Sequence, residues 1–175
     1  MTALGLVARW APLRAGVFLV GTFAFLLLAG RSDRLTVVAW ERSLTRWTRW
    51  AAGLLLLSGL LSLSYQAAVV TGHPGDALSA ATMLRLLGAT QFGTVWLLRH
   101  GLLLLLAGLI LLREREESGL DWAAFRGEGL LLGGTGLGLL AGAGHAAAVE
   151  PGGLAAAGAD ALHLLSVGIW LGGLM

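Results

Sequence analysis

The sequence predicts an all-α fold, a polytopic membrane helix bundle with about five transmembrane helices. Hydrophobic residues make up 57% of the chain, and the mean hydropathy is +0.79. Only 13% of the residues are charged, about half of the roughly 25% that is typical of soluble domains. Uncharged runs recur at about the 20 residues that a helix needs to cross the hydrocarbon core. We therefore expect residues 1–175 to form a single transmembrane domain.

Five runs are long and apolar enough to be spans. They are Leu13–Gly30, Ala51–Val70, Thr94–Leu112, Gly129–Ala148 and a run that starts near Ala159 and is still apolar at Met175. The fifth run is barely long enough to cross a bilayer. This predicts a fragment, or a short relative, of a longer chain. Between the second and third runs, Ala77–Leu87 is expected to form a short helix at the membrane interface.

Arginine placement predicts the orientation. All twelve basic residues are arginines, and most lie beside apolar runs, where they act as topological anchors rather than as a nucleic-acid site. Eight fall in the connections after the first and third spans: Arg31, Arg34, Arg42, Arg46, Arg49, Arg113, Arg115 and Arg126. The positive-inside rule makes that side cytoplasmic, with the N-terminus outside and the C-terminus inside.

This topology places the four histidines of the chain in one leaflet, the outer one. They are His73, His100, His145 and His163. Asp160 lies three residues before His163, so the two side chains share one helical face. Ionisable groups within spans usually face a bundle interior or a wet cavity. Asp160 and His163, with His145 and His100, are therefore candidate metal ligands, and His73 is a weaker one because Pro74 and Gly75 already explain a turn there.

Glycines predict how the last two spans meet. Gly134, Gly138 and Gly142 repeat every four residues in the fourth span, and Gly168 and Gly172 form a second small-residue face in the fifth. We expect these faces to pack together and to bring His145 near Asp160 and His163. A homo-oligomer is a further open alternative.

Several interpretations of these residues remain open. Asp160 also suits an N-cap that accepts a bond from the His163 amide. Arg99 either extends towards the membrane surface or pairs with Asp160 or Glu150. Imidazole and carboxylate donors without thiolate suit Cu(II) or Zn, whereas His100 opposed to His145 or His163 suits b-type haem. The chain has no cysteine, and its only methionines besides the first are Met83 and Met175. A soft Cu(I) conduit is therefore not expected.

Four stretches are similar to one known family. "GHAAA" at 144–148 and "DALHLLSVGIWLGGL" at 160–174 resemble the copper-resistance D (CopD-like) family of bacterial inner-membrane proteins. "TRWTRWAAGLLLLSGLLSL" at 45–63 and "TQFGTVWLLRHGLLLLL" at 90–106 resemble its pattern of an Arg-flanked helix followed by entry into the next helix.

The resemblance implies a multi-pass protein that moves copper across the bacterial cytoplasmic membrane, often with a periplasmic copper-binding partner of the CopC type. It makes His145, Asp160 and His163 ligand candidates, and Trp170, Gly172 and Gly173 packing positions. His73 and His100 are added from topology alone. We expect a transporter rather than an enzyme. The alternatives are a b-type haem electron-transfer or quinone-reactive protein, and a metal-free scaffold that binds other membrane subunits.

Overall fold

The computed structural model describes residues 3–112, 118–144 and 152–174. Within them the chain is helical and contains no strand, which confirms the all-α membrane bundle. The α-helices are α1 (Ala3–Ala29), α2 (Leu35–Thr71), α3 (Ala80–Ala89), α4 (Gln91–Leu112), α5 (Gly119–Gly138) and α6 (Gly153–Gly172). Two short 3-10 helices, η1 (Pro74–Leu78) and η2 (Leu139–Ala143), precede α3 and follow α5.

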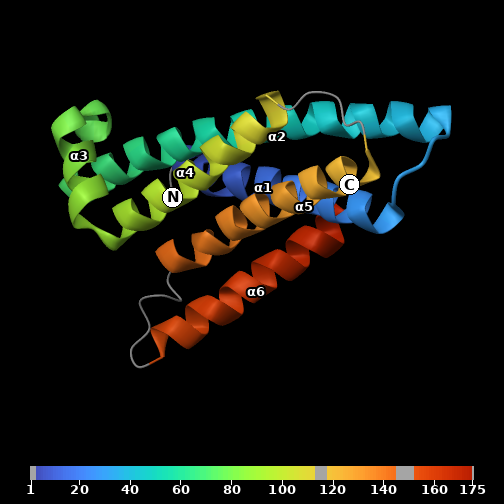
Figure 1. The fold of residues 1–175 in the computed structure, drawn as a ribbon. Coiled ribbons are helices and arrows are strands. Elements are labelled where there is room, and N and C mark those ends of the chain that lie inside the picture. The colour runs from blue at the N-terminus through green and yellow to red at the C-terminus, as the bar shows by residue number, and fades with distance from the viewer. Residues whose placement is uncertain (1–2, 113–117, 145–151, 175) are drawn as a thin grey trace.

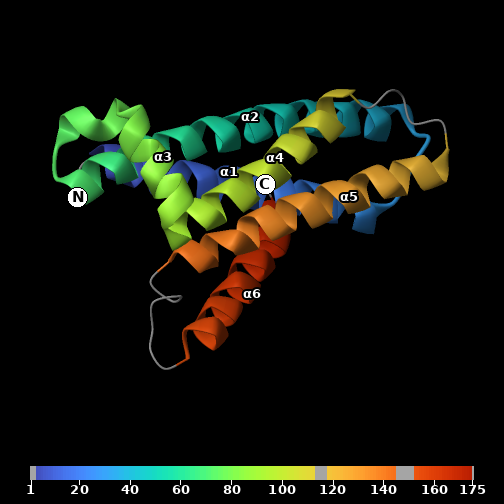
Figure 2. The same cartoon turned by 60° about the vertical axis from the view of Figure 1, so that its left-hand side comes forward.

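The long helices pack around α1, which contacts α2, α5 and α6. Figures 1 and 2 show α3 at one end of the bundle, where α2 ends and α4 begins, and α6 inclined to the other helices. The segment Ala77–Leu87, expected to be a short helix, corresponds to the end of η1 and most of α3. Ser79 caps α3 by accepting a bond from the Thr82 amide.

α2 is longer than the second predicted span. It starts at Leu35 rather than near Ala51, because the arginine-rich segment is itself helical. The helix ends at Gly72, whose φ of 73° lies in the left-handed region that favours glycine. Over 37 residues it extends about 55 Å, well beyond the roughly 30 Å of hydrocarbon. Part of α2 therefore extends beyond the hydrocarbon core, and the arginines at 42, 46 and 49 favour its N-terminal part.

α5 differs from the fourth predicted span. It begins at Gly119, where Ser118 and Asp121 form a reciprocal capping box, and changes to 3-10 geometry at Leu139. Its 20 residues include Asp121, Arg126 and Glu128. Four described helices, α1, α2, α4 and α6, are long and apolar enough to cross a membrane, and α5 is not among them. The predicted fourth span, Gly129–Ala148, begins after the charged part of α5, covers its second half and η2, and continues outside the described residues, so it stays a prediction.

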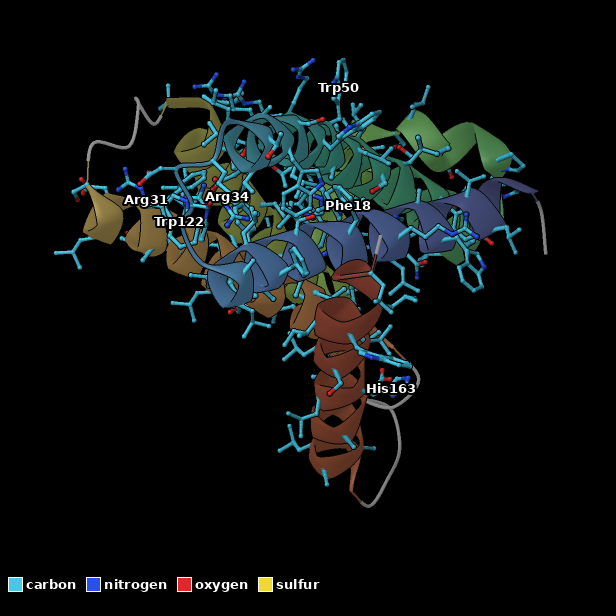
Figure 3. The ribbon with its side chains drawn as sticks, turned by 90° about the vertical axis from the view of Figure 1, so that its right-hand side faces the viewer. Phe18, Arg31, Arg34, Trp50, Trp122 and His163 are labelled. Atoms are coloured by element: carbon cyan, nitrogen blue, oxygen red, sulfur yellow. The ribbon has the colours of Figure 1, made fainter. Side chains whose placement is uncertain are left out.

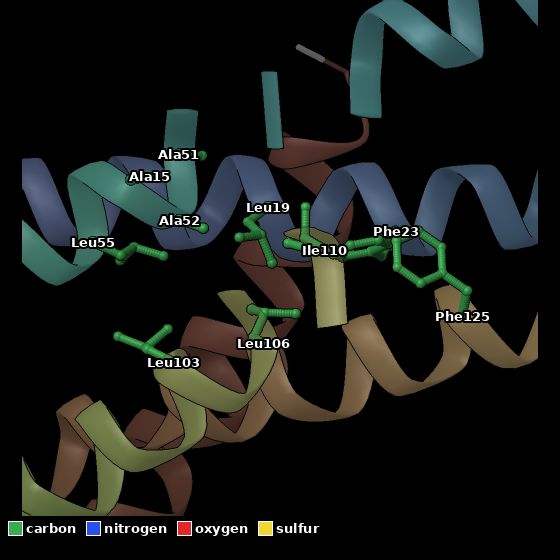
Figure 4. Packing of buried hydrophobic residues seen from close by; sticks show 10 residues of the cluster. All are labelled: Ala15, Leu19, Phe23, Ala51, Ala52, Leu55, Leu103, Leu106, Ile110 and Phe125. Atoms are coloured by element: carbon green, nitrogen blue, oxygen red, sulfur yellow. The ribbon is translucent and has the colours of Figure 1, made fainter. Parts of the chain in front are cut away.

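The largest apolar cluster joins α1, α2, α4 and α5 (Figure 4). Leu19 and Leu106 are fully buried at its centre. Phe23 of α1 meets Phe125 of α5 edge to face, with ring centroids 5.8 Å apart. The ten buried members of the cluster are Ala15, Leu19, Phe23, Ala51, Ala52, Leu55, Leu103, Leu106, Ile110 and Phe125. This cluster holds α1, α2, α4 and α5 together, whereas α6, which carries Asp160 and His163, packs against α1 and α5 outside it.

Candidate functional site

Asp160 and His163 lie near the middle of α6, the least covered of the long helices. Asp160 is partly buried and His163 is exposed. Figure 3 shows α6 projecting from the side of the bundle, with His163 on the projecting part. Within the described residues the His163 imidazole therefore faces away from the protein interior and is open to a ligand or to lipid.

Asp160 turns towards the end of η2. Its Oδ2 atom would lie 4.0 Å from a Cβ atom placed on Gly144. Gly144 directly precedes His145 in the sequence, and His145 lies outside the described residues. The carboxylate is thus beside the backbone that leads to the next candidate ligand. Asp160 does not cap α6, which begins at Gly153 with Gly152 as its N-cap.

The glycine faces pack on other partners than expected. A Cβ atom on Gly172 would overlap the carbonyl oxygen of Val17, and a Cβ atom on Gly21 would overlap the backbone of Gly172. The small-residue face of α6 therefore packs against α1 rather than against the glycines of α5. On α5, Gly134 and Gly138 face Leu165 and Ala161 of α6.

The third glycine of the α5 series also has a different neighbour. Gly142, in η2, faces Val95 of α4. The α5–α6 contact therefore exists, but it is made by glycines against side chains rather than by two glycine faces. Close helix approach requires small residues on at least one side, and here α1 supplies the second small residue, Gly21.

His100 is buried between α4 and α2. Its ring stacks on Trp96, one turn earlier, with centroids 3.7 Å apart and an interplanar angle of 15°. Its Nδ1 atom is 2.8 Å from the Trp96 carbonyl oxygen. Because a carbonyl only accepts, Nδ1 carries the proton that is donated. The other ring nitrogen, Nε2, is buried and has no hydrogen-bond partner among the described residues.

Gly59 of α2 provides the space for this ring. The Trp96 indole donates to the Gly59 carbonyl oxygen at 2.9 Å, and a Cβ atom on Gly59 would overlap His100 Nε2. His100 therefore faces α2, on the side of α4 away from α6. Since His100 and His163 do not face each other, the haem alternative gains no support from the described residues.

Replacing Gly59 with alanine is expected to destabilise the protein, because the added methyl group must displace the stacked His100–Trp96 pair. Such overpacking typically lowers the free energy of unfolding by about 1–3 kcal/mol. Thermal unfolding in mild detergent, followed by circular dichroism, measures the change. Gly53→Ala in the same helix is the control, since a Cβ atom there meets nothing within 4 Å. Equal melting temperatures for the two variants would contradict this account of the α2–α4 contact.

Arg99 is buried beside His100 but faces α5. Its Nε atom donates to the Gly136 carbonyl oxygen at 3.2 Å, and the residue is 6% exposed. Within the described residues it forms no ion pair with Asp160. The alternative partner, Glu150, lies outside the described residues. α4 therefore directs the Arg99 guanidinium towards α5 and the His100 imidazole towards α2.

The described residues do not bring the predicted ligands into one cluster. His73 is exposed at the start of η1, where its amide donates to Thr71 Oγ1. Among the described ranges no group of three or more His, Asp or Glu side chains lies close enough to hold one ion. That search does not include His145, so the proposed set of His145, Asp160 and His163 stays a prediction.

Sequence reasoning missed a polar cluster at the opposite end of the bundle. Glu41 of α2 forms an ion pair with Arg126 of α5, and its Oε1 atom accepts a bond from the Trp122 indole at 2.6 Å. Arg126 also lies over the Trp122 ring, 4.2 Å from its centroid. The signal was present, since Glu41 is the lone acid in "WERSLTRWTRW". This cluster joins α2 to α5 rather than forming part of the candidate site.

Comparison with known proteins identifies the family. The chain matches the family model described as copper resistance protein D-like, N-terminal domain, over residues 1–156. No curated protein and no solved structure matches the chain. The matched range includes α1 to η2 and ends within the first residues of α6. The chain therefore belongs to the copper resistance protein D-like family and has a copper-related function in a membrane.

Proposed function

We propose that this protein takes up copper and transfers it across the bacterial cytoplasmic membrane, through a His/Asp site in the outer leaflet. The ion is the cargo of the protein, and no covalent catalysis is involved. His145 and His163 would bind the ion, with Asp160 as a third donor or as the acceptor that orients an imidazole. Family membership supports the choice of metal.

The observation that carries the proposal is the position of Asp160. Its carboxylate lies beside Gly144, the residue before His145, and on the same helix as His163 three residues later. Neighbours at i and i+3 are about 5–6 Å apart on a helix. Asp160 is therefore close to the backbone of Gly144 and one helical turn from His163, which supports a role as a ligand or as the acceptor that orients a ligating imidazole.

Ligand chemistry favours the oxidised ion. Imidazole and carboxylate donors suit Cu(II), whereas Cu(I) is selected by thiolate and thioether groups. The chain has no cysteine. The exposed imidazole of His163 would allow hand-over from a periplasmic protein of the CopC type, because the acceptor ligand must reach an ion that is still held by its donor.

Copper accumulation in cells that express the protein tests the proposal. Wild type should raise cell-associated copper, measured by mass spectrometry of washed cells, and His163→Ala should abolish the increase. Asp160→Asn should reduce it by about 10- to 100-fold if the carboxylate holds a ligating imidazole in position. Ser166→Ala is the matched control, since among the described residues that hydroxyl bonds only to the Leu162 carbonyl one turn away.

Two further outcomes would contradict the proposal. If His163→Ala accumulates as much copper as wild type at equal expression, α6 does not carry the site. If cells that express the wild-type protein contain less copper than cells that lack it, the protein exports copper rather than importing it. Metal analysis of the purified protein separates a loss of binding from a loss of movement.

A further inference from the structure

The N-terminal part of α2 lies at a membrane boundary. Arg49 and Thr71 are 22 residues apart in one continuous helix, a rise of about 33 Å. This length equals the hydrocarbon thickness of a bilayer. With Thr71 at one boundary, Arg49 lies at the other, and Arg42 and Arg46 lie one to two turns further out, at the depth of lipid headgroups.

These three arginines form one exposed face, the α2 arginine stripe, defined as Arg42, Arg46 and Arg49. Their spacing of four and three residues places them above one another on the helix. All three are exposed, and none forms an ion pair within the described part of the chain. Guanidinium groups bind phosphate oxygens with two parallel hydrogen bonds.

The acid that might neutralise the stripe is turned away from it. Glu41 precedes Arg42 in the sequence, but it projects about 100° away around α2, and its carboxylate is engaged by Arg126 and Trp122 of α5. The outward face of this helical segment therefore has three positive charges and no negative one. Its electrostatic complement is an anion in the headgroup layer.

Tryptophans accompany the stripe. Trp47 and Trp50 are 60% and 71% exposed, and Trp40 is 44% exposed. Figure 3 shows Trp50 pointing outward from α2. Indole rings prefer the headgroup level of a bilayer, which independently assigns this segment to that depth.

Below the arginines the same helix face becomes apolar. Leu57 and Leu60 are 63% and 54% exposed, and Gly53 has nothing within 4 Å of an added Cβ atom. Taking 100° per residue, Gly53, Leu57 and Leu60 lie within about 60° of Arg42 around the helix. A basic upper half and an open apolar lower half match a lipid headgroup and its acyl chains.

We propose that the α2 arginine stripe and the apolar surface below it bind an anionic phospholipid, with the lipid phosphate held by Arg42, Arg46 and Arg49. The acyl chains lie along Gly53, Leu57 and Leu60. The proposal concerns the end of the bundle away from His163 and does not depend on copper.

Lipid titration of the purified full chain in mild detergent tests this. Fluorescent phosphatidylglycerol is the probe, and fluorescent phosphatidylcholine is the neutral comparison. Each basic residue near an anionic surface contributes enough that its loss weakens binding about fivefold, so R42Q/R46Q should weaken phosphatidylglycerol binding about 25-fold. The R42Q/R46Q variant should fold with the same helix content as wild type, because both arginine side chains are exposed.

Three comparisons make the result decisive. R14Q/R85Q removes two exposed arginines elsewhere and should leave the affinity within about twofold of wild type. R42K/R46K retains the charge and should retain most of the binding. The third comparison is a salt series on the wild-type protein. Raising salt from 0.1 to 1 M shortens the screening length from about 10 to about 3 Å, which should weaken the binding of phosphatidylglycerol but not of phosphatidylcholine.

The proposal is overturned if wild type binds both lipids equally, or if R42Q/R46Q binds phosphatidylglycerol like wild type. It is also overturned if R14Q/R85Q weakens binding as much as R42Q/R46Q, because the effect would then be one of net charge alone. Should R42Q/R46Q lose its circular dichroism spectrum, the lysine variant and the salt series decide the question.

Discussion

Replacing Glu41 with alanine is expected to lower the free energy of unfolding by about 3–5 kcal/mol, the usual cost of breaking a buried ion pair. The carboxylate accepts from two side chains of α5, the guanidinium of Arg126 and the indole of Trp122. Arg126 is only 3% exposed, so water does not replace the lost partner. The loss should fall on the contact between α2 and α5.

Thermal unfolding in detergent, with circular dichroism as the readout, measures this loss. Glu41→Gln should be milder, because the amide oxygen still accepts from Trp122 while the charge is gone. Asp33→Asn, an exposed acid to amide change in the connection between α1 and α2, is the control and should be neutral. A Glu41→Ala variant that melts within a degree of wild type would show that the pair does not hold these helices together.

Replacing Gly172 with alanine should separate α6 from α1. The added Cβ atom would overlap the Val17 carbonyl oxygen, and this atom belongs to backbone that cannot rotate away. We expect a loss of about 1–3 kcal/mol, towards the upper end of the range because α1 itself must shift. Gly158→Ala in the same helix is the control, since nothing lies within 4 Å of its Cβ position.

Spin labels measure this separation directly. The chain has no cysteine, so cysteines introduced at the exposed Leu28 of α1 and Leu162 of α6 can be labelled without background. The distance distribution between the labels should broaden in Gly172→Ala and stay narrow in Gly158→Ala. A narrow distribution in both would mean that the glycine contact does not position α6.

Hydropathy and charge were enough to predict the fold class and four of the spanning helices. They could not predict where α2 begins, because charged residues at a membrane boundary are compatible with both helix and loop. The segment Leu35–Trp50 is helical since nothing interrupts it, with no proline or glycine between Leu35 and Trp50. The start of α5 was missed for a related reason, since its first half is polar yet well capped by Ser118.

The candidate site was only partly accessible to sequence reasoning. The i, i+3 relation of Asp160 and His163 required only helical periodicity, but which way His100 faces depended on Gly59 of a different helix. The preceding residue, Arg99, faces α5 instead. The direction in which these side chains face depends on tertiary packing between helices. A single sequence does not show which glycine accommodates which ring.

The central position of α1 has a consequence for how the protein is made. Of the described helices α1 is synthesised before the others, yet 61% of its apolar 18-residue window is buried inside the bundle. Until α2 and α5 arrive, Leu19 and Phe23 must face lipid or the insertion machinery. The only buried hydroxyl of the described α1, on Thr22, is already bonded to the Phe18 carbonyl oxygen of the same helix. The Thr22 hydroxyl is therefore already satisfied while α1 is in the bilayer before the other helices have packed against it.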